Sequence, residues 1–141
     1  MKRLRKFVFL SGRDRKLLVK TAGVLWFVRL GLWLLSYETL CRLVRKHNPS
    51  QNNAADVVQV KRIVRSVRKM SRYVPASTCL TKALAAIVLL ERADQPANLV
   101  IGVAKSQVGD LEAHAWVECQ GRVILGGTHA ELSRYSILRP V

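Results

Sequence analysis

The sequence has few acidic residues, few aromatic residues and no long uncharged hydrophobic run. Against 24 Lys and Arg it has 9 Asp and Glu, which gives a formal net charge of +15. This excess favours anionic partners and does not bear on the fold. Apolar residues make up 50% of the 141 residues, which predicts a packed interior and excludes a disordered tail. The length excludes a barrel of eight βα units and a two-domain enzyme.

Cysteine and histidine are scarce and scattered along the chain. There are three of each, at Cys41, Cys79, Cys119, His47, His114 and His129. An odd number of cysteines without a CxxC pair predicts neither a disulfide framework nor a zinc ribbon. We therefore expect no metal site and no cofactor.

Two apolar runs near the N-terminus fall short of an export signal and of a membrane span. The basic start, residues 1–6, precedes an apolar run of only residues 7–10, which is too short for a signal peptide. Residues 21–37 are nearly long enough to cross a bilayer, but Arg29 lies in the middle of the run. A span needs about 20 largely uncharged residues. We expect a reduced, cytoplasmic location.

The basic residues are concentrated in the first half of the chain. Residues 1–48 carry 12 basic and 2 acidic side chains, residues 49–78 carry 6 and 1, and residues 79–141 carry 6 and 6. The last segment is rich in Val, Ile, Leu and Ala, as expected for the half that builds the core. We predict a basic helical extension over residues 1–54 and the core over residues 55–141, within one domain.

Residues 14–45 have apolar side chains at helical spacing. The pattern predicts two helices, hinged near Tyr37 and with Gly31 as another break point, that bury an apolar stripe and expose a basic face. The stripe comprises Leu17, Leu18, Thr21, Val24, Leu25, Val28, Leu32 and Leu35. We interpret these helices as a cap on the core. Contact with a membrane surface is the alternative, since basic amphipathic helices also bind there.

A further helix is predicted before Pro75. Apolar residues recur every three or four positions, at Val57, Val60, Val64, Val67, Met70 and Val74. Asn52 or Asn53 could cap the start of this helix. Pro75 ends the helix because the residue before a proline is pushed out of helical geometry. Six Lys and Arg lie on its other side, which we interpret as a solvated face and not as a nucleic-acid site.

The remaining elements predict an α+β fold. Residues 79–92 form a buried helix, with Ser77 or Thr78 as its N-cap. Three segments have the composition of strands: residues 97–103, 112–119 and 122–126. Gln120-Gly121 predicts a two-residue hairpin loop between the last two. Strand alternation puts His114, Trp116 and Glu118 on one face. Pairing across the hairpin places Cys119 opposite Arg122 and Trp116 opposite Leu125.

Cys79 and His114 are the candidate catalytic residues. The first turn of a helix stabilises a thiolate through its unsatisfied N–H groups and the positive end of the helix dipole. A histidine on a neighbouring strand could complete an ion pair with the thiolate, the arrangement that activates thiols for acyl transfer. Backbone N–H groups at the same helix start could form an oxyanion hole.

The segments around these residues resemble a known family. They are residues 79–84 (CLTKAL), 89–92 (LLER), 99–103 (LVIGV) and 113–118 (AHAWVE) with Gly121-Arg122. Together they resemble the papain/transglutaminase-like core of lasso-peptide leader peptidases, in particular the stand-alone peptidase half of the split lasso-peptide B protein. Residues 13–18 and 28–35 are similar to the helical front end of that family. The resemblance implies a nucleophile helix packed on a small antiparallel sheet, with an N-terminal helical extension.

The resemblance also implies a function. It predicts a cysteine peptidase in which Cys79 is the nucleophile and His114 the general base and acid, removing the leader from a ribosomally made precursor peptide. A separate leader-binding protein and an asparagine-synthetase-like, ATP-using cyclase are the implied partners. Relatives often place an acidic residue about twelve positions after the histidine, where this chain has Gly126. A backbone carbonyl, Thr128, Glu112, Glu118 or Glu131 could orient His114 instead.

Three alternatives follow from the same residues. Trp116 shares the face of His114 and could wall a substrate groove, although a tryptophan in a small sheet is more often core material. The acyl-enzyme could pass its acyl group to an amine, as in a transglutaminase. A non-catalytic module, in which the basic helices bind nucleic acid or anionic membrane, is the alternative from a different class.

Overall fold

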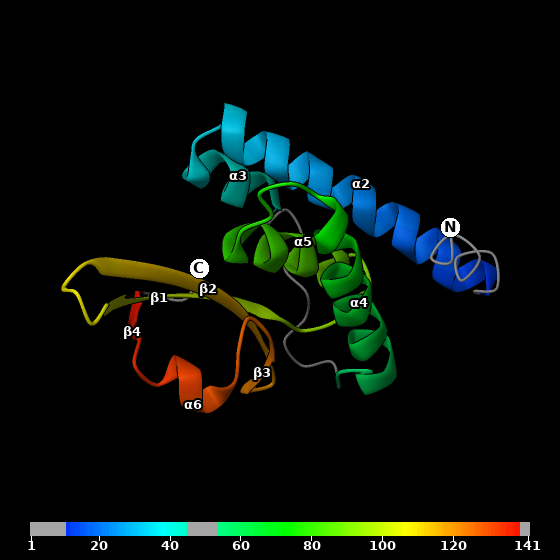
Figure 1. The fold of residues 1–141 in the computed structure, drawn as a ribbon. Helices are drawn as coiled ribbons and strands as arrows, with labels where there is room; N and C mark the ends of the chain where they lie inside the picture. Colours follow the sequence, from blue (N-terminus) through cyan, green and yellow to red (C-terminus); the bar gives the residue numbers. More distant parts are fainter. Residues whose placement is uncertain (1–10, 45–53, 139–141) are drawn as a thin grey trace.

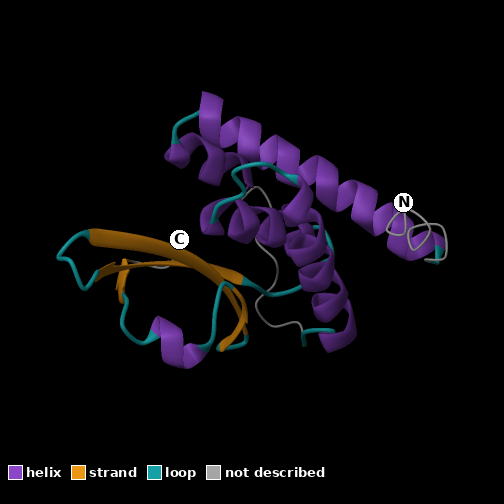
Figure 2. Cartoon of the chain, viewed as in Figure 1, coloured by secondary structure: helices purple, strands orange, loops and turns teal. Residues whose placement is uncertain are grey.

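The computed structural model describes residues 11–44 and 54–138, and it places the four larger helices on one side of a small sheet and the short helix α6 on the other (Figures 1 and 2). The larger helices are α2 (Gly12–Leu34), α3 (Tyr37–Val44), α4 (Val57–Met70) and α5 (Cys79–Glu91), with a short 3₁₀ turn η1 (Ser71–Tyr73) after α4. The strands are β1 (Asn98–Lys105), β2 (Leu111–Cys119), β3 (Arg122–Leu125) and β4 (Ser136–Leu138), and α6 (His129–Leu132) precedes β4. The predicted α+β architecture is confirmed.

The first two helices are hinged where the sequence predicts. α2 ends at Leu34 and α3 begins at Tyr37. Gly31, however, does not break α2, and the prediction of a second break point there was wrong. A Cβ on Gly31 would lie 2.8 Å from Cδ1 of Leu40. The glycine therefore gives α3 room to pack its fully buried Leu40 against α2.

The outer face of α2 differs from the prediction of a basic face. The predicted stripe is buried at Leu18, Thr21, Val24, Leu25 and Val28, as expected. Leu17 and Leu32 are partly buried, and the prediction was wrong for Leu35, which follows the last residue of the helix and is exposed. The opposite face is apolar as well, with large exposed side chains at Val19, Trp26, Phe27, Leu30, Trp33 and Leu34. The basic residues lie mainly in the N-terminal half of the helix. α2 is therefore long and apolar enough to cross a membrane, although 33% of its most apolar window is buried inside the protein.

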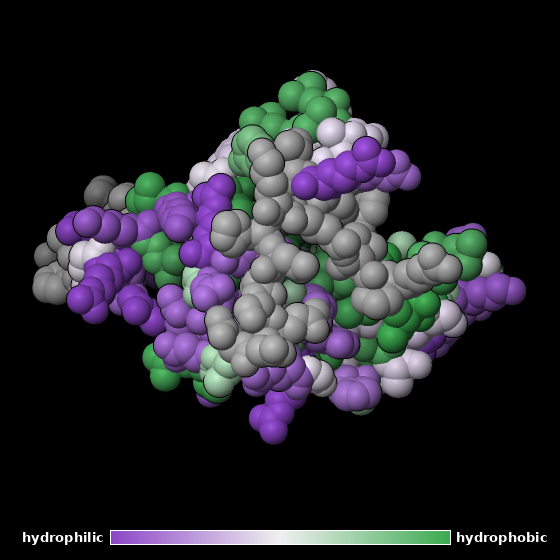
Figure 3. Space-filling view, turned by 180° about the vertical axis from the view of Figure 1, so that it is seen from behind, coloured by the Kyte–Doolittle hydropathy of each residue, from purple (hydrophilic) through white to green (hydrophobic). Residues whose placement is uncertain are grey.

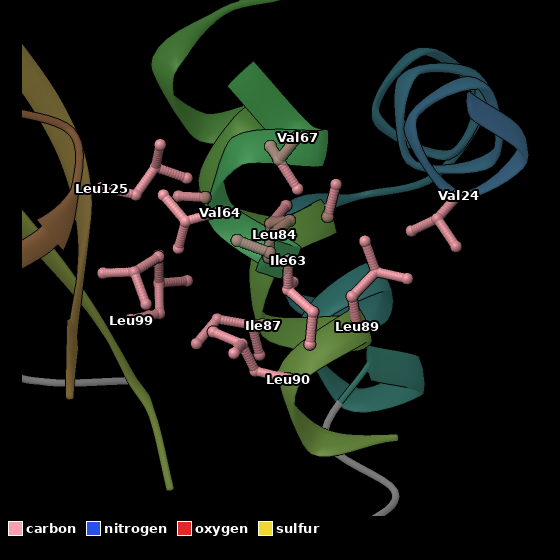
Figure 4. Packing of buried hydrophobic residues seen from close by; sticks show 14 of the residues in the cluster. Val24, Ile63, Val64, Val67, Leu84, Ile87, Leu89, Leu90, Leu99 and Leu125 are labelled. Atoms are coloured by element: carbon pink, nitrogen blue, oxygen red, sulfur yellow. The ribbon is translucent and has the colours of Figure 1, made fainter. Parts of the chain in front are cut away.

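The four larger helices and one face of the sheet share the main core. Figure 4 shows Val24 of α2, Ile63, Val64 and Val67 of α4, Leu84, Ile87, Leu89 and Leu90 of α5, and Leu99 and Leu125 of the strands around this core. α5 is central because it packs against α2, α4 and β2. α4 begins after Asp56, whose side chain caps the helix, so the prediction of Asn52 or Asn53 as the cap was wrong; those two residues lie outside the described ones. α4 itself ends at Met70, earlier than predicted, and the 3₁₀ turn continues to Tyr73, so the helical conformation ends before Pro75 as expected.

The sheet has the order β3-β2-β1-β4. Gln120 and Gly121, with φ of 49° and 74°, form the predicted tight hairpin loop, and Cys119 pairs with Arg122. On the side of Glu118 away from the hairpin loop, the predicted register was wrong. An irregularity between Val117 and Glu118 places Val117, not Trp116, opposite Leu125. One extra residue on β3 accounts for this shift, as in a β-bulge. β4 and α6 are both very short and were not predicted, although Thr128 and Glu131 form a capping box, which is a sequence signal for the start of α6.

Candidate active site

Cys79 is the first residue of α5. The side chain of Thr78 caps this helix by accepting a hydrogen bond from the Thr81 amide at 3.3 Å. The thiol is half-buried and packs against the main core cluster. The N–H groups of the first helical turn are available at its side, because the intrahelical hydrogen-bond ladder starts only later in the helix. The structure thus places Cys79 where the sequence predicts, at the N-terminal end of the central helix.

His114 lies in β2, and its ring is held by a backbone carbonyl. The distance from His114 Nε2 to the Gly126 oxygen is 2.5 Å. A carbonyl oxygen only accepts hydrogen bonds, so Nε2 carries the proton and donates it. Nδ1 is then the ring nitrogen that remains to accept a proton from another group. Gly126 occupies the position at which the family resemblance led us to expect an acidic residue. The carbonyl of Gly126, and not a carboxylate, accepts the hydrogen bond from the imidazole.

The other groups that could have oriented His114 have different partners. Glu118 accepts a hydrogen bond from Trp116 Nε1 at 2.9 Å, and Glu112 forms an ion pair with Arg134 at 3.2 Å. Glu131 caps the start of α6: its carboxylate accepts from the Thr128 amide and hydroxyl, at 2.8 and 2.9 Å. These two hydrogen bonds, with a smaller contribution from the charge of His114, lower the pKa of Glu131. The carboxylate of Glu131 is therefore engaged by Thr128.

Trp116 lies under the imidazole. The ring centroids of His114 and Trp116 are 6.3 Å apart and their planes differ by 23°, and Tyr135 contacts both rings. Trp116 is 2% exposed and forms a small second core cluster with Val100 and Leu132. This packing requires a glycine in β1, because a Cβ on Gly102 would lie 2.9 Å from the indole ring. The predicted role of Trp116 in a substrate groove stays a prediction.

The sheet separates the surroundings of the two candidate residues. Ala115 and Val117 of β2 belong to the core on the α5 side, together with Cys79. His114 and Trp116 point to the other face, which α6 covers (Figure 1). In the described part of the chain no hydrogen bond connects the Cys79 thiol to the imidazole. The pairing of Cys79 with His114 therefore stays a prediction, to be tested by experiment.

Neither Cys119 nor His129 joins the site. Cys119 is buried at 7% exposure, and this burial raises the pKa of its thiol. His129 begins α6 and is exposed. The side chain of Cys41, and His47 altogether, fall outside what the structure describes. Among residues 11–44 and 54–138, no group of three or more His, Cys, Asp and Glu side chains is arranged to hold a metal ion.

A basic cleft lies between α2 and α4, on the helical side of the molecule. Its volume is about 390 Å³, and it is lined by Asp14, Leu17, Leu18, Arg62, Arg65, Ser66 and Lys69. Arg62 forms an ion pair with Asp14, and its hydrogen bond to that carboxylate lowers the pKa of Asp14. Thr21 and Ser66 hydrogen-bond across the two helices at 2.8 Å and fix their spacing. The cleft therefore has a rigid, partly apolar wall and a cationic rim.

Residues 24–139 match the family model of the transglutaminase-like superfamily. The chain belongs to this superfamily, which includes cysteine peptidases. The match begins at Val24, near the middle of α2, and includes the whole sheet, in agreement with the shared core of these elements. No curated protein and no solved structure gives a significant match. The division at residues 54 and 55 stays a prediction.

Sequence reasoning missed one contributor to the site and left another without a residue name. Tyr135 packs on the rings of His114 and Trp116, but it follows a short helix that the sequence did not predict. A backbone carbonyl was one of the predicted orienting groups for His114, but Gly126 was not named as the residue that supplies it. The signal that could have identified it is the adjacent pair Gly126-Gly127, since both adopt positive φ, 111° and 146°. Consecutive glycines after a strand often mark a close approach of the backbone to another group.

Proposed function

We propose that this chain is a cysteine peptidase that removes the leader from a ribosomally synthesised lasso-peptide precursor. The observation that carries the proposal is the hydrogen bond from His114 Nε2 to the Gly126 carbonyl, which fixes the tautomer that a thiol needs in its base. Membership of the transglutaminase-like superfamily and the position of Cys79 at a helix N-terminus support it further. The precursor, a leader-binding protein and an asparagine-synthetase-like cyclase are the proposed partners, in a cytoplasmic setting.

The proposed mechanism uses Cys79 and His114 in two half-reactions. Nδ1 of His114 takes the thiol proton, and the Cys79 sulfur attacks the scissile carbonyl. The C–N bond breaks, the leaving amine takes the proton from the imidazolium, and a thioester remains on Cys79. Water then loses a proton to the imidazole and attacks the thioester, the C–S bond breaks, and the leader leaves as a carboxylic acid. Because the sheet separates the two side chains in the structure, this mechanism requires a rearrangement that brings the Cys79 thiol and the imidazole within hydrogen-bond distance.

Product mass distinguishes this reaction from amide transfer. Purified protein, precursor and the leader-binding partner are incubated with an excess of a primary amine, and the leader product is weighed by mass spectrometry. Hydrolysis gives a leader with a free carboxylic acid. A leader that carries the added amine would identify a transglutaminase reaction and contradict the peptidase proposal.

The thiol of Cys79 is expected to react with iodoacetamide at least about tenfold faster than the thiol of Cys119. Cys79 is half-buried at a helix N-terminus, whereas Cys119 is buried and its pKa is raised. The rates are measured at neutral pH by peptide mapping, in which each cysteine is found on its own peptide. An unreactive Cys79, together with salt-sensitive DNA binding, would favour the non-catalytic binding module instead.

We further propose that the basic cleft between α2 and α4 binds an acidic segment of the precursor. Arg65 and Lys69 lie at its rim, and Arg62 is held there by Asp14. Apolar side chains of Leu17 and Leu18 line the same cleft, so a peptide with acidic and apolar residues fits its chemistry. Interactions at such an exposed rim are modest in energy and weaken with salt.

Replacing Arg65 by alanine is expected to raise KM for the precursor about threefold at low salt while leaving kcat unchanged, since exposed ion pairs contribute up to about 1 kcal/mol. Arg72→Ala is the matched control, because Arg72 is an exposed arginine that does not line the cleft. Initial rates of cleavage against precursor concentration give both constants. Equal effects of the two substitutions would show that only the overall charge matters.

A further inference from the structure

We propose that the outward face of α2 inserts into the headgroup region of an anionic lipid bilayer and holds the protein at the membrane surface. The face is the set of exposed apolar side chains on α2 that the core does not cover. It comprises Val19, Trp26, Phe27, Leu30, Trp33 and Leu34, with exposed fractions from 47% to 76%. Apolar side chains of this size are expected on the surface singly, not as one group on one helix.

These side chains form one continuous strip along the helix. At about 100° of rotation per residue, the six positions fall within an arc of about 120°, opposite the arc that Leu18, Leu25 and Val28 bury. Figure 1 shows α2 lying across the helical layer on the side away from the sheet. In Figure 3, apolar atoms gather at the top, over the C-terminal end of α2. The strip is therefore on the outside of the molecule and accessible to a flat surface.

The geometry indicates that α2 lies in the plane of the membrane and does not cross it. One side of the helix is fixed to the protein, with Leu25 and Val28 fully buried and Thr21 hydrogen-bonded to Ser66 of α4. A spanning position would carry α4, with Arg62 and Arg65, into the hydrocarbon, where each charge costs several kcal/mol. A helix with one face in a protein core and the other apolar is suited to the interface.

The charge distribution favours anionic lipid over a protein as the occupant. Four exposed basic residues lie at the N-terminal end of the same helix, where they can reach lipid headgroups: Arg13, Arg15, Lys16 and Lys20. Two of the strip residues are tryptophans, the side chains that prefer the membrane–water interface. A second copy of the chain carries the same +15 charge and would be repelled. The combination of a basic end, an apolar strip and exposed tryptophans is complementary to a negatively charged bilayer.

The test is flotation of the full chain with vesicles. We expect the protein to float with vesicles of phosphatidylcholine mixed with phosphatidylglycerol, more weakly with pure phosphatidylcholine, and less at high salt. Replacing two strip residues together, Leu30→Gln and Trp33→Gln, is expected to lower the partition coefficient at least about tenfold. The control pair is Val108→Gln and Leu111→Gln, which removes equally exposed apolar side chains beside the β1–β2 connection, 88% and 75% exposed. It is expected to leave flotation unchanged.

Tryptophan fluorescence gives a second measurement on the same samples. Trp26 and Trp33 are exposed and Trp116 is buried, so insertion shifts the emission to shorter wavelength through the first two only. Because Leu30 and Trp33 are exposed, the circular dichroism spectrum of their double variant is expected to match the wild type. Three outcomes would each overturn the proposal. They are absence of flotation, equal flotation of this variant and the wild type, and a dimer in vesicle-free solution that the same substitutions dissociate.

Discussion

Replacing Cys79 by alanine is expected to abolish leader cleavage, with a loss in kcat of at least about 10³-fold. The substitution removes the only atom that forms a bond to the substrate in the proposed mechanism. Cleavage is measured by mass spectrometry with precursor and the leader-binding partner present. Because the Cys79 side chain is half-buried, the variant is expected to fold, with a circular dichroism spectrum like that of the wild type. Wild-type cleavage rates for this variant would refute the mechanism.

The matched control is Cys119→Ala, which removes the same thiol from a buried position in β2. It is expected to cost some stability and to leave kcat unchanged. His114→Ala is expected to reduce kcat as strongly as Cys79→Ala, and the double variant to be no slower than either single one, because residues that act as a unit have non-additive effects. Additive losses would show that the two side chains act independently, which would contradict their proposed role as one catalytic pair.

The sequence predicted the elements that carry strong local signals. The periodicity of α4, the proline after it and the all-apolar α5 each predicted a helix with a definite end. Gln120-Gly121 predicted the hairpin because a tight two-residue loop needs positive φ at both positions. Cys79 at the helix start follows from Thr78, a good N-cap. These are properties of short segments, and tertiary packing did not override them.

What the sequence could not predict depends on contacts between distant segments. The extra residue in β3 shifts the register by one position, and nothing in residues 122–125 signals it. Gly31 looks like a helix breaker, yet its role is to let Leu40 approach. The sequence predicted the buried face of α2 but not the apolar character of its outer face, because apolar residues surround the C-terminal half of the helix and only the packed structure shows which ones are covered.

The orientation of His114 by a main-chain oxygen has a steric cause. A Cβ on Gly126 would lie 2.5 Å from Cβ and 2.7 Å from Cα of Trp116. An acidic side chain therefore does not fit at this position with the backbone as it stands. The same absence of a side chain lets the chain approach β2 closely enough for the Gly126 oxygen to reach the imidazole. A carbonyl orients the ring but carries no charge, so it stabilises an imidazolium less than a carboxylate would.

Gly126→Ala is accordingly expected to destabilise the protein by about 2–5 kcal/mol, from backbone strain at a φ of 111° and from overlap with Trp116. Gly121→Ala is the matched control: Gly121 also has positive φ, 74°, but a Cβ there would meet nothing within 4 Å. Its expected cost is about 1 kcal/mol, for strain alone. Urea denaturation measures both, and equal costs would show that the contact with Trp116 is not tight.

Activity measurements then separate the steric role of Gly126 from its role toward His114. At a temperature where both variants are folded, Gly126→Ala is expected to lower kcat because the displaced carbonyl no longer holds Nε2, whereas Gly121→Ala leaves kcat unchanged. If Gly126→Ala does not fold, Gly127→Ala replaces it, since a Cβ on Gly127 would meet its nearest neighbours at 3.4 and 3.5 Å, within ordinary contact distance. Unchanged kcat in a folded variant whose carbonyl has moved would mean that another group orients the imidazole.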